Sequence, residues 1–216
     1  MIDKLIGVYG ASGFGREVIP VVKSQISSSN TCLAFIDDAG FPARSINGYQ
    51  VYNWEEFLAH PAREKYVVLA IADARIRILL TNRCHEQEIP FFQVVAPSVI
   101  LGDEVTIGDG SILQPFVNLT SNIIIGQCFQ ANIYSYVAHD CKIGDFVTFA
   151  PGVMCNGNVH VGDRAYIGTG AVIKQGTPEK PLIIGADAIV GMGAVVTKNV
   201  PDGVTVVGNP ARILER

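Results

Sequence analysis

The chain has 216 residues, of which 49% are apolar and 17% charged, and this balance is sufficient for a packed core. The net charge of −4, without any run of lysines or arginines, excludes a partner bound through the phosphate backbone of a nucleic acid. The apolar stretches are far shorter than the roughly 20 residues that cross a bilayer, and the opening residues do not form a signal peptide, so we expect a cytoplasmic protein without membrane insertion.

As far as Val95, apolar runs alternate with helix-like stretches, which is the pattern of a small parallel α/β unit. Buried strands are predicted over 4–9, 31–36 and 66–71, with a fourth over 91–95. Helices are predicted over 14–23, 54–60 and 73–87. The pattern changes at 96–98, so we divide the chain into a Rossmann-like half fold over residues 1–97 and a second domain over 98–216.

Beyond this point, apolar residues recur at every sixth position. Thirteen consecutive repeats run from Leu101 to Pro178, and the first residue of each is apolar. A small or apolar residue stands four positions later in each repeat, from Val105 to Thr177, so each repeat offers two inward positions. Glycine follows the first apolar residue in several repeats, where a tight corner needs an unhindered backbone: Gly102, Gly108, Gly144 and Gly162.

The six-residue phase breaks after Pro178 and resumes at Ile184, which predicts that the five extra residues, 179–183, bulge out as a loop. Further repeats start at Ile184, Val190 and Val196. A uniform repeat of this kind is typical of a solenoid with three flat sides, so three repeats should form one turn. Residues that are three repeats apart should then stack on one face.

Three features together resemble a known family: the repeats, the terminal Val-Gly-Asn-Pro-Ala-Arg at 207–212 and the opening Gly-Ala-Ser-Gly-Phe-Gly at 10–15. They are similar to the bacterial sugar acyltransferases that include sialic-acid O-acetyltransferases and UDP-N-acetylbacillosamine N-acetyltransferase. The resemblance covers almost the whole chain. It implies that the C-terminal half is a left-handed parallel β-helix that forms a homotrimer. It also implies that acetyl-CoA lies between neighbouring subunits and that the N-terminal half binds the nucleotide of the acceptor.

Few histidines are available as a general base, because the chain has four. Val137 and Cys141 occupy inward positions, which places His139 and Asp140 on an outer corner. A carboxylate beside an exposed imidazole can orient the ring and raise its basicity. Without the resemblance, a solvated surface histidine would be the plain interpretation. The resemblance implies that His139 is the catalytic base and that Asp140 is its partner.

One turn of three repeats beyond His139 lies Gly157, whose N–H could donate to the thioester carbonyl of acetyl-CoA as an oxyanion donor. The alternative is a glycine needed only for a β-helix corner. Asn132 matches a family position near the acceptor. At Thr148, relatives commonly carry a second histidine that contacts the acetyl donor. Threonine keeps a hydrogen-bonding group but cannot act as an acid or base.

The resemblance also implies contacts to the pantetheine arm of acetyl-CoA at Thr169, Gly191 and Met192, with ordinary coil residues as the alternative. Nearby cations could meet the CoA phosphates, or could be solvated side chains: Lys174, Lys180, Lys198 and Arg212.

The segment Gly10–Gly15 follows a predicted strand and precedes a predicted helix, where a Gly-rich turn and a helix N-terminus can hold phosphate. Its glycine order differs from the dinucleotide fingerprint, and the domain has room for only half of a dinucleotide fold, which favours one nucleotide over NAD. The resemblance implies that Asp37 and Asp38 meet uridine, with a polar turn as the alternative. The implied UDP-sugar site comprises Gly10, Ser12, Gly13, Phe14, Asp37, Asp38, Ala72 and Asn132.

No metal site is predicted. His160 does not fall on the same stack as His139, because three repeats beyond His139 lead to Gly157, so the register offers no three converging histidines. Five cysteines without a C-x-x-C pair support neither a disulfide framework nor a zinc ribbon. The inward register of Cys141 and Cys155 makes both poor acyl-accepting nucleophiles.

The predicted activity is direct transfer of acetyl from acetyl-CoA, the donor substrate, to the 4-amino group of a UDP-linked amino sugar of the bacillosamine type. The product would serve surface glycan or glycoprotein synthesis, and no cofactor would be bound permanently. One alternative is O-acetylation of sialic acid or another sugar hydroxyl. Another is a non-catalytic nucleotide-sugar-binding scaffold, against which His139-Asp140 and a glycine one coil away argue.

Overall fold

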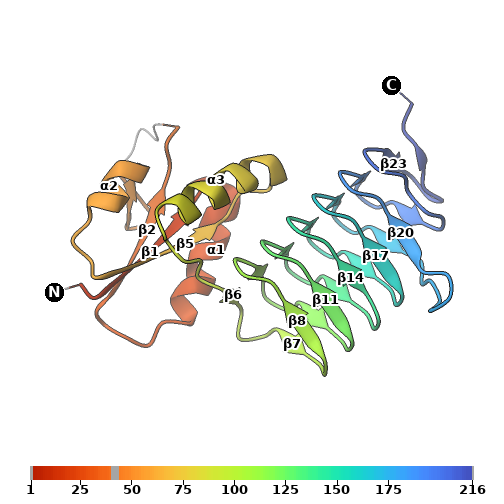
Figure 1. Cartoon of the computed structure of the whole chain (residues 1–216), viewed down its shortest axis with the longest axis horizontal. Helices are drawn as coiled ribbons and strands as arrows, with labels where there is room; N and C mark the ends of the chain where they lie inside the picture. The colour runs from red at the N-terminus through yellow and green to blue at the C-terminus, as the bar shows by residue number, and fades with distance from the viewer. Residues whose placement is uncertain (1, 40–43, 216) are drawn as a thin grey trace. The chain divides into compact units, whose positions relative to one another are not determined.

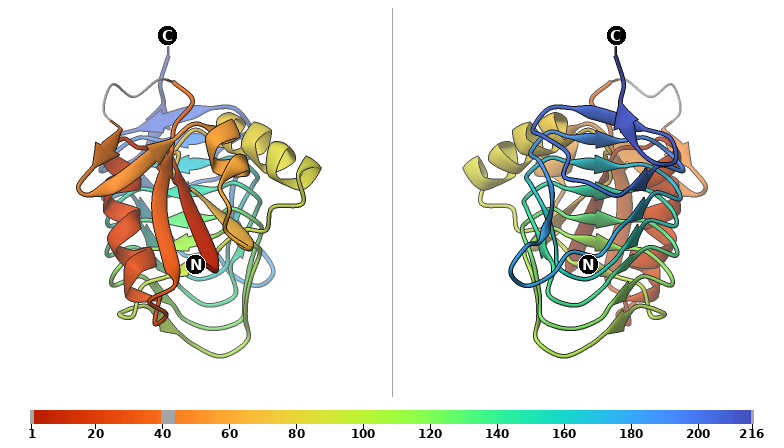
Figure 2. Two further views of the ribbon diagram at one scale, coloured as in Figure 1. Left: turned by 90° about the vertical axis from the view of Figure 1, so that its left-hand side faces the viewer. Right: turned by 90° about the vertical axis from the view of Figure 1, so that its right-hand side faces the viewer.

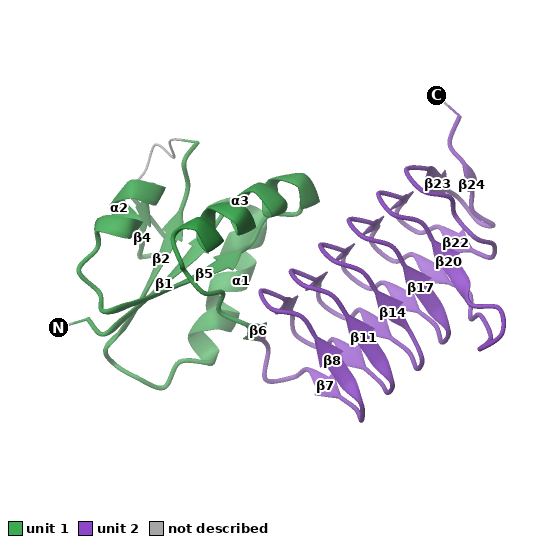
Figure 3. Cartoon of the chain, viewed as in Figure 1, with its two compact units in different colours: residues 1–94 green, residues 95–216 purple. Residues whose placement is uncertain are grey.

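A computed structural model describes residues 2–39 and 44–215 of the chain. The chain divides into two compact units, residues 1–94 and 95–216 (Figure 3). The division falls three residues before the boundary that the sequence suggested at residue 97. Unit 1 is an α/β fold, and unit 2 is a left-handed parallel β-helix (Figure 1).

Unit 1 contains a five-stranded sheet in the order β3-β4-β2-β1-β5. Its parallel strands are β1 (Lys4–Tyr9), β2 (Thr31–Ile36), β4 (Tyr49–Tyr52) and β5 (Glu64–Leu69). The first two are the predicted strands, and β5 lies two residues earlier than predicted. The antiparallel hairpin of β3 (Ser45–Ile46) with β4 was not predicted, although its Asn47-Gly48 turn, with φ of 51° and 83°, is a typical hairpin signal.

The three predicted helices are present as α1 (Gly13–Ser24), α2 (Trp54–Ala59) and α3 (Ala74–Glu86). The N-terminal boundary of α3 is set by Asp73, whose side chain caps the helix by accepting from the N–H groups of Arg75 and Ile76. The predicted strand over 91–95 is wrong for this sheet. Phe91 makes a single bridge to Val67, and the following residues leave to join unit 2. Among the described residues, no helix is long and apolar enough to span a membrane.

Unit 2 is a stack of coils with three faces, and each face is a β-sheet of parallel strands (Figures 1 and 2). Sheet I contains β6 (Val94–Val95), β9 (Ile112–Leu113), β12 (Gln130–Ala131), β15 (Thr148–Phe149), β18 (Tyr166–Ile167), β21 (Ile189–Val190), β23 (Thr205–Val207) and the antiparallel β24 (Arg212–Ile213). Sheet II contains β7 (Ile100–Leu101), β10 (Asn118–Leu119), β13 (Tyr136–Val137), β16 (Met154–Cys155), β19 (Val172–Ile173) and β22 (Val195–Val196). Sheet III contains β8 (Val105–Ile107), β11 (Ile123–Ile125), β14 (Lys142–Ile143), β17 (Val159–Val161) and β20 (Leu182–Ile184).

The predicted turn of three repeats is confirmed by the pairing of strands, in which Gln130 faces Thr148 and Tyr136 faces Met154. The inward positions form one continuous apolar core. Two end positions do not fit the prediction. Leu101 is 48% exposed because it lies in the first strand of its sheet, and Thr177 is exposed in a loop.

The loop after the thirteenth repeat lies earlier than predicted. Leu182 is buried and pairs with Val159 of the preceding coil, so the five extra residues precede Leu182. Leu182 thereby takes the inward place that the register had given to Thr177. Regular stacking continues to Gly176, whose N–H donates to the Gly157 carbonyl, so the five extra residues are 177–181, within the loop between β19 and β20. The predicted loop is present, and its predicted bounds of 179–183 lie two residues too late.

Each corner follows one backbone rule. Every sixth residue from Glu104 to Gly170 has a positive φ, and most of these residues are not glycine. The glycines that follow the first apolar residue of a repeat were predicted to form the tight corners, but their φ angles are not positive. A Cβ on Gly102 would lie 1.6 Å from the carbonyl oxygen of Thr120, so glycine here allows the next coil to approach closely.

Candidate active site

His139 and Asp140 lie where sheet II meets sheet III, an edge that we call edge II/III. The Nδ1 atom of His139 is 2.7 Å from the Oδ2 atom of Asp140. Both side chains are half exposed, at 47% and 45%. Asp140 occupies the left-handed position of its coil, with a φ of 59°, and its carboxylate meets the preceding ring. Because Asp140 engages Nδ1, Nε2 is the ring nitrogen left for proton transfer.

Gly157 lies directly beneath the His139 ring. A Cβ on Gly157 would be 2.6 Å from both Cε1 and Nε2 of the imidazole. The backbone of Gly157 is not left-handed, so the corner itself does not require glycine. The missing side chain therefore makes room for the ring, which argues against a purely structural corner glycine. Asn158 N–H also donates to the carbonyl of His139 at 3.0 Å, which ties the two coils together.

Four other predicted residues lie at a different edge, where sheet I meets sheet II, which we call edge I/II. Thr169 and Met192 are exposed there, Met192 to 81%, and Gly191 precedes Met192 in the same corner. The fourth is Asn132, whose Nδ2 donates to the Phe149 carbonyl at 2.8 Å and so holds the next coil.

Thr148 is buried within sheet I, in β15. Within one chain, sheet II separates edge I/II from edge II/III. The structure therefore unites His139, Asp140 and Gly157, and separately Thr169 with Gly191 and Met192, but it does not bring the two sets together.

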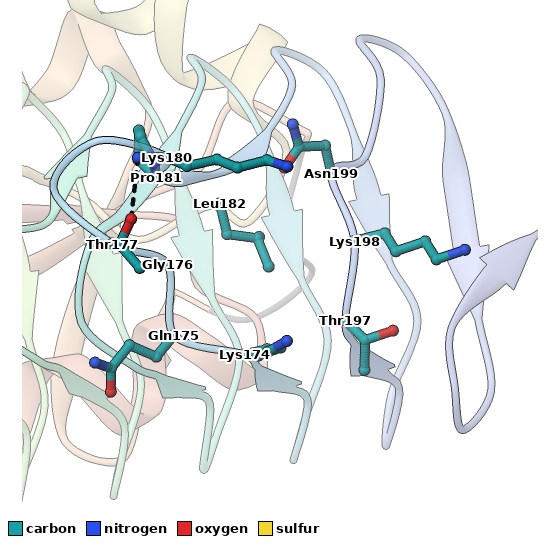
Figure 4. A pocket seen from close by; sticks show the side chains of 10 residues that line it. All are labelled: Lys174, Gln175, Gly176, Thr177, Lys180, Pro181, Leu182, Thr197, Lys198 and Asn199. Carbon is teal, nitrogen blue, oxygen red and sulfur yellow. Dashed lines mark hydrogen bonds between the residues drawn. The ribbon is translucent and has the colours of Figure 1, made fainter.

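A pocket of about 570 Å³ lies on edge II/III, between the loop 174–181 and the corner 197–199 (Figure 4). It is lined by Lys174, Lys180 and Lys198, three of the predicted cations. In Figure 4 the Lys180 side chain runs along the pocket toward Asn199. An adjoining pocket of about 310 Å³ is lined by Lys198 and Arg212. One lining residue of the larger pocket, Gly176, is hydrogen-bonded to the coil of Gly157, because its N–H donates to the Gly157 carbonyl at 2.9 Å.

In unit 1, the segment Gly10–Gly15 lies at the carboxyl end of the sheet, where β1 is flanked by β2 and β5. The connections of β1 and β5 leave in opposite directions, which makes this a topological switch point. Gly10 has a φ of 105°, and a Cβ on Gly15 would lie 1.8 Å from the Gly10 carbonyl oxygen, so the turn itself requires both glycines. Gly13 is different, because nothing lies within 4 Å of its Cβ position.

The N-terminus of α1 lacks side-chain capping. Ser12 is the N-cap residue but makes no side-chain capping hydrogen bond, and the first turn carries no acid. The unpaired N–H groups and the helix dipole therefore favour a bound anion. Phe14 follows in the first turn and is half-buried, and Ala72 lies beyond β5 with its carbonyl accepting from Arg77 at 2.8 Å.

The two acidic residues Asp37 and Asp38 have different hydrogen-bond partners. Asp37 accepts from Ala11 N–H at 3.3 Å and from Ala39 N–H at 3.0 Å, which places its carboxylate beside the Gly-rich turn. Asp38, also predicted to meet the nucleotide, has several hydrogen-bond partners of its own. Its carboxylate binds the Tyr9 hydroxyl, Arg83 at 2.5 Å and the Trp54 N–H at 2.9 Å, all within unit 1.

These contacts make Asp38 a structural residue that joins the end of β2 to the start of α2. Burial raises the pKa of the Asp38 carboxyl, but the hydrogen bonds from Tyr9, the Trp54 N–H and Arg83 together bring that pKa below its usual value. The pKa of Tyr9 is raised by burial and by its contact with Asp38. Arg83 also lies over the Trp54 ring, 4.9 Å from its centre.

In residues 2–39 and 44–215, no three His, Cys, Asp or Glu side chains gather in a way that could hold a metal ion. His160 lies in β17, where it pairs with Lys142 of the preceding coil. Burial and the charge of Lys142 lower the pKa of His160.

A β-helix of six-residue repeats with a histidine–carboxylate pair on one edge, joined to a Gly-rich α/β unit, defines the class of hexapeptide-repeat acyltransferases. Residues 5–84 match the PglD N-terminal domain family. The chain is 49% identical over 215 residues to GDP-perosamine N-acetyltransferase of Escherichia coli O157:H7, and the match covers 98% of this chain and 97% of that protein. The chain belongs to this family of acetyl-CoA-dependent sugar N-acetyltransferases.

Solved structures extend the similarity. WeeI from Acinetobacter baumannii AYE is 58% identical with a TM-score of 0.93, over 98% of this chain and 100% of that one. PerB from Caulobacter crescentus, in complex with CoA and GDP-perosamine, is 26% identical with a TM-score of 0.86, over 97% of both chains. The acetyltransferase domain of PglB from Neisseria gonorrhoeae FA1090, in complex with acetyl coenzyme A, is 26% identical with a TM-score of 0.86, over 97% of this chain and 98% of that one.

Proposed function

We propose that this protein transfers the acetyl group of acetyl-CoA to the amino group of a nucleotide-linked amino sugar, with His139 as the general base. The observation that carries the proposal is the imidazole of His139, held at Nδ1 by Asp140 and lying over Gly157. The chain is similar from end to end to a sugar N-acetyltransferase, which supports an amine acceptor over the sugar hydroxyl of the O-acetyltransferase alternative.

In the proposed reaction the amino nitrogen attacks the thioester carbonyl carbon of acetyl-CoA. Nε2 of His139 takes a proton from that nitrogen, while Asp140 stabilises the imidazolium through Nδ1–H. Gly157 N–H donates to the carbonyl oxygen as it becomes negative. The carbon–sulfur bond then breaks, and the leaving thiolate receives the proton that His139 took from the amine, so the products are the N-acetyl sugar and free CoA and the imidazole is neutral again. This direct transfer does not require an acyl-enzyme intermediate.

The two edges of the β-helix support the homotrimer that the sequence suggested. If the family contacts at Thr169 and Met192 and the base His139 serve one acetyl-CoA, they must come from two copies, because one chain separates them. A symmetric ring would bring edge II/III of one copy against edge I/II of the next. The lysine-lined pocket on edge II/III would then receive the CoA phosphates. Sedimentation of a stable, active monomer would contradict this arrangement.

The acceptor nucleotide is assigned to unit 1. Its phosphates would lie at the open N-terminus of α1, where Gly13 leaves space, and Asp37 would accept from the base. The 49% identical relative is named for GDP-perosamine, which favours a GDP-linked amino sugar. The UDP-linked 4-amino sugar of the bacillosamine type is the second candidate, because a carboxylate accepts from the ring N–H of uracil as well as of guanine. The use of acetyl-CoA is consistent with the predicted cytoplasmic location.

The test is release of free CoA thiol from acetyl-CoA in the presence of GDP-linked and UDP-linked 4-amino sugars and of sialic acid. Mass spectrometry of the product should show one added acetyl group, on nitrogen. His139→Ala should lower kcat by about 10²–10⁴-fold with little change in acetyl-CoA affinity, which is the range of a general base. His85→Ala, at an exposed histidine on α3, is the matched control and should leave kcat unchanged. Activity of His139→Ala above about a tenth of wild type would rule out His139 as the base.

A further inference from the structure

Two buried thiols lie behind the His139 corner, and the proposed chemistry does not use them. Cys141 and Cys155 are fully buried and occupy inward positions of adjacent coils. Sγ of Cys141 lies 3.2 Å from the carbonyl oxygen of Asn156 and 3.6 Å from that of His139, and the nearer oxygen, that of Asn156, is the better acceptor for its single hydrogen. Cys155 Sγ is 3.8 Å from the Asn156 oxygen. The Asn156 carbonyl therefore points into the core.

The direction of this carbonyl decides where the N–H of Gly157 points. The Asn156 carbonyl and the Gly157 N–H belong to one peptide group, and in a trans peptide the two bonds point in opposite directions. With the carbonyl inward, the N–H points outward, to the side on which the His139 ring lies. Within the described part of the chain this N–H donates no hydrogen bond, whereas nearly all buried N–H groups do. The Gly157 N–H is therefore available to donate a hydrogen bond to a ligand.

The side chain of Asn156 holds the same peptide group between coils. Its Oδ1 accepts from the Tyr136 hydroxyl at 2.7 Å, in the coil that carries His139. Its Nδ2 donates to the carbonyl of Ile173 at 2.7 Å, in the coil beyond. Both polar ends of the amide are therefore engaged, and the amide links three successive coils at the level of Gly157.

We infer that Cys141 and Asn156 are positioning residues that hold the Asn156–Gly157 peptide with its N–H directed at the acetyl carbonyl oxygen. This inference rests on the proposed function, because it assigns that N–H to the oxyanion. A hydrogen bond to the carbonyl also polarises the peptide group, which strengthens its N–H as a donor.

Ser135 shows what part of this arrangement is purely structural. Its hydroxyl donates to the carbonyl of Ala150 and accepts from the N–H of Val153. Cys141 has the two equivalent partners, Asn156 and Val159, at the same spacings along the chain. Serine should therefore replace Cys141, whereas alanine should not. Ser135→Ala removes the same contacts from a corner of edge I/II, which carries no base.

The experiment compares Cys141→Ala, Cys141→Ser and Ser135→Ala. Tyr136→Phe is a second probe, because it removes the hydroxyl that donates to the Asn156 side chain. Loss of an oxyanion donor costs about 10²–10³-fold, so a misdirected one should lower kcat by about tenfold in Cys141→Ala and Tyr136→Phe. The KM for acetyl-CoA and the midpoint of the pH–rate profile should not move. Cys141→Ser should recover kcat to within about threefold of wild type. Ser135→Ala should lower the Tm by about as much as Cys141→Ala, with kcat unchanged. Tyr166→Phe, at a hydroxyl without a hydrogen bond in the described part of the chain, is the control for Tyr136→Phe.

Wild-type kcat in Cys141→Ala or in Tyr136→Phe would overturn the inference. A fall in kcat that Ser135→Ala shares, or that serine at position 141 does not recover, would also overturn it, because the effect would then reflect stability alone. Failure of the proposed function would look different, since the wild type itself would not transfer acetyl or His139→Ala would remain active.

Discussion

Gly157→Ala tests the site geometry with a single methyl group. The new Cβ would lie 2.6 Å from Cε1 and Nε2 of His139 and 3.0 Å from Nδ1. Non-bonded carbon atoms rest at about 3.5–4.0 Å, so the ring must retreat by about 1 Å. A misplacement of this size can cost about 10²-fold in rate, and we expect that loss in kcat. The fold should tolerate the change, because the backbone of Gly157 is not left-handed and the ring is half exposed and can move into solvent.

The assay is steady-state kinetics of wild type, Gly157→Ala, His139→Ala and the double variant, with Tm measured for each. If the methyl acts by displacing the ring, it should cost little once His139 is alanine, so the two losses should not multiply. The peptide N–H is kept in Gly157→Ala, which separates this effect from loss of the oxyanion donor. An equal cost of the methyl in both backgrounds would refute the contact between His139 and Gly157 as its cause. Wild-type kcat in Gly157→Ala alone would refute it as well.

Three further predictions concern other parts of the site. Gly13→Leu should weaken binding of the nucleotide sugar, because the leucine fills the open space before α1. Calorimetry should show this loss with acetyl-CoA affinity nearly unchanged. If the variant and the wild type bind the nucleotide sugar equally well, this turn is not the nucleotide site. Asp140→Asn should lower kcat less than His139→Ala, because the imidazole stays; an equal or larger loss in the same kinetic assay would contradict an orienting role. Asp38 has a folded-state pKa below its unfolded value of about 3.9, so its stabilising effect is complete above that value and is lost as pH falls through the folded-state pKa. The Tm difference between wild type and Asp38→Asn should therefore close on acidification, and a constant difference would show that the Asp38 charge does not stabilise the fold.

The β-helix could be predicted because its signal is periodic. Each coil repeats the same two inward positions, and any error in one repeat is corrected by its neighbours. The insertion after Ile173 could not be located in this way. The residues between Ile173 and Leu182 show no clear apolar period, so the register shows that five residues are extra but not where they enter. Burial and pairing of Leu182 decide the question, and both depend on the three-dimensional packing.

The candidate base and its glycine follow from the same periodicity, since Gly157 stands three repeats after His139. The role of Asp38 could not be found from the sequence. Its partners Tyr9 and Arg83 are distant along the chain, on a strand and a helix that meet it only in the folded unit. The hairpin turn at Asn47-Gly48 was within reach of sequence reasoning, because Asn-Gly before a short alternating strand is a recognised turn signal.

The edge that carries His139 shows how little the candidate active site adds to a repeating fold. The left-handed backbone of Asp140 is shared by every sixth residue from Glu104 to Gly170, so the β-helix itself turns the carboxylate toward the residue before it. Coils stack at about 4.8 Å, and the imidazole occupies space that one missing side chain leaves in the next coil. The inserted residues then enter at the same edge and bring Lys180 to a pocket that Lys174 also lines, and the pocket residue Gly176 donates to the Gly157 carbonyl. The same five residues inserted at edge I/II would preserve the stacking of the core, but they would take Lys180 away from His139. The stacking of the fold leaves the position of the insertion open, whereas the proposed donor site accounts for it.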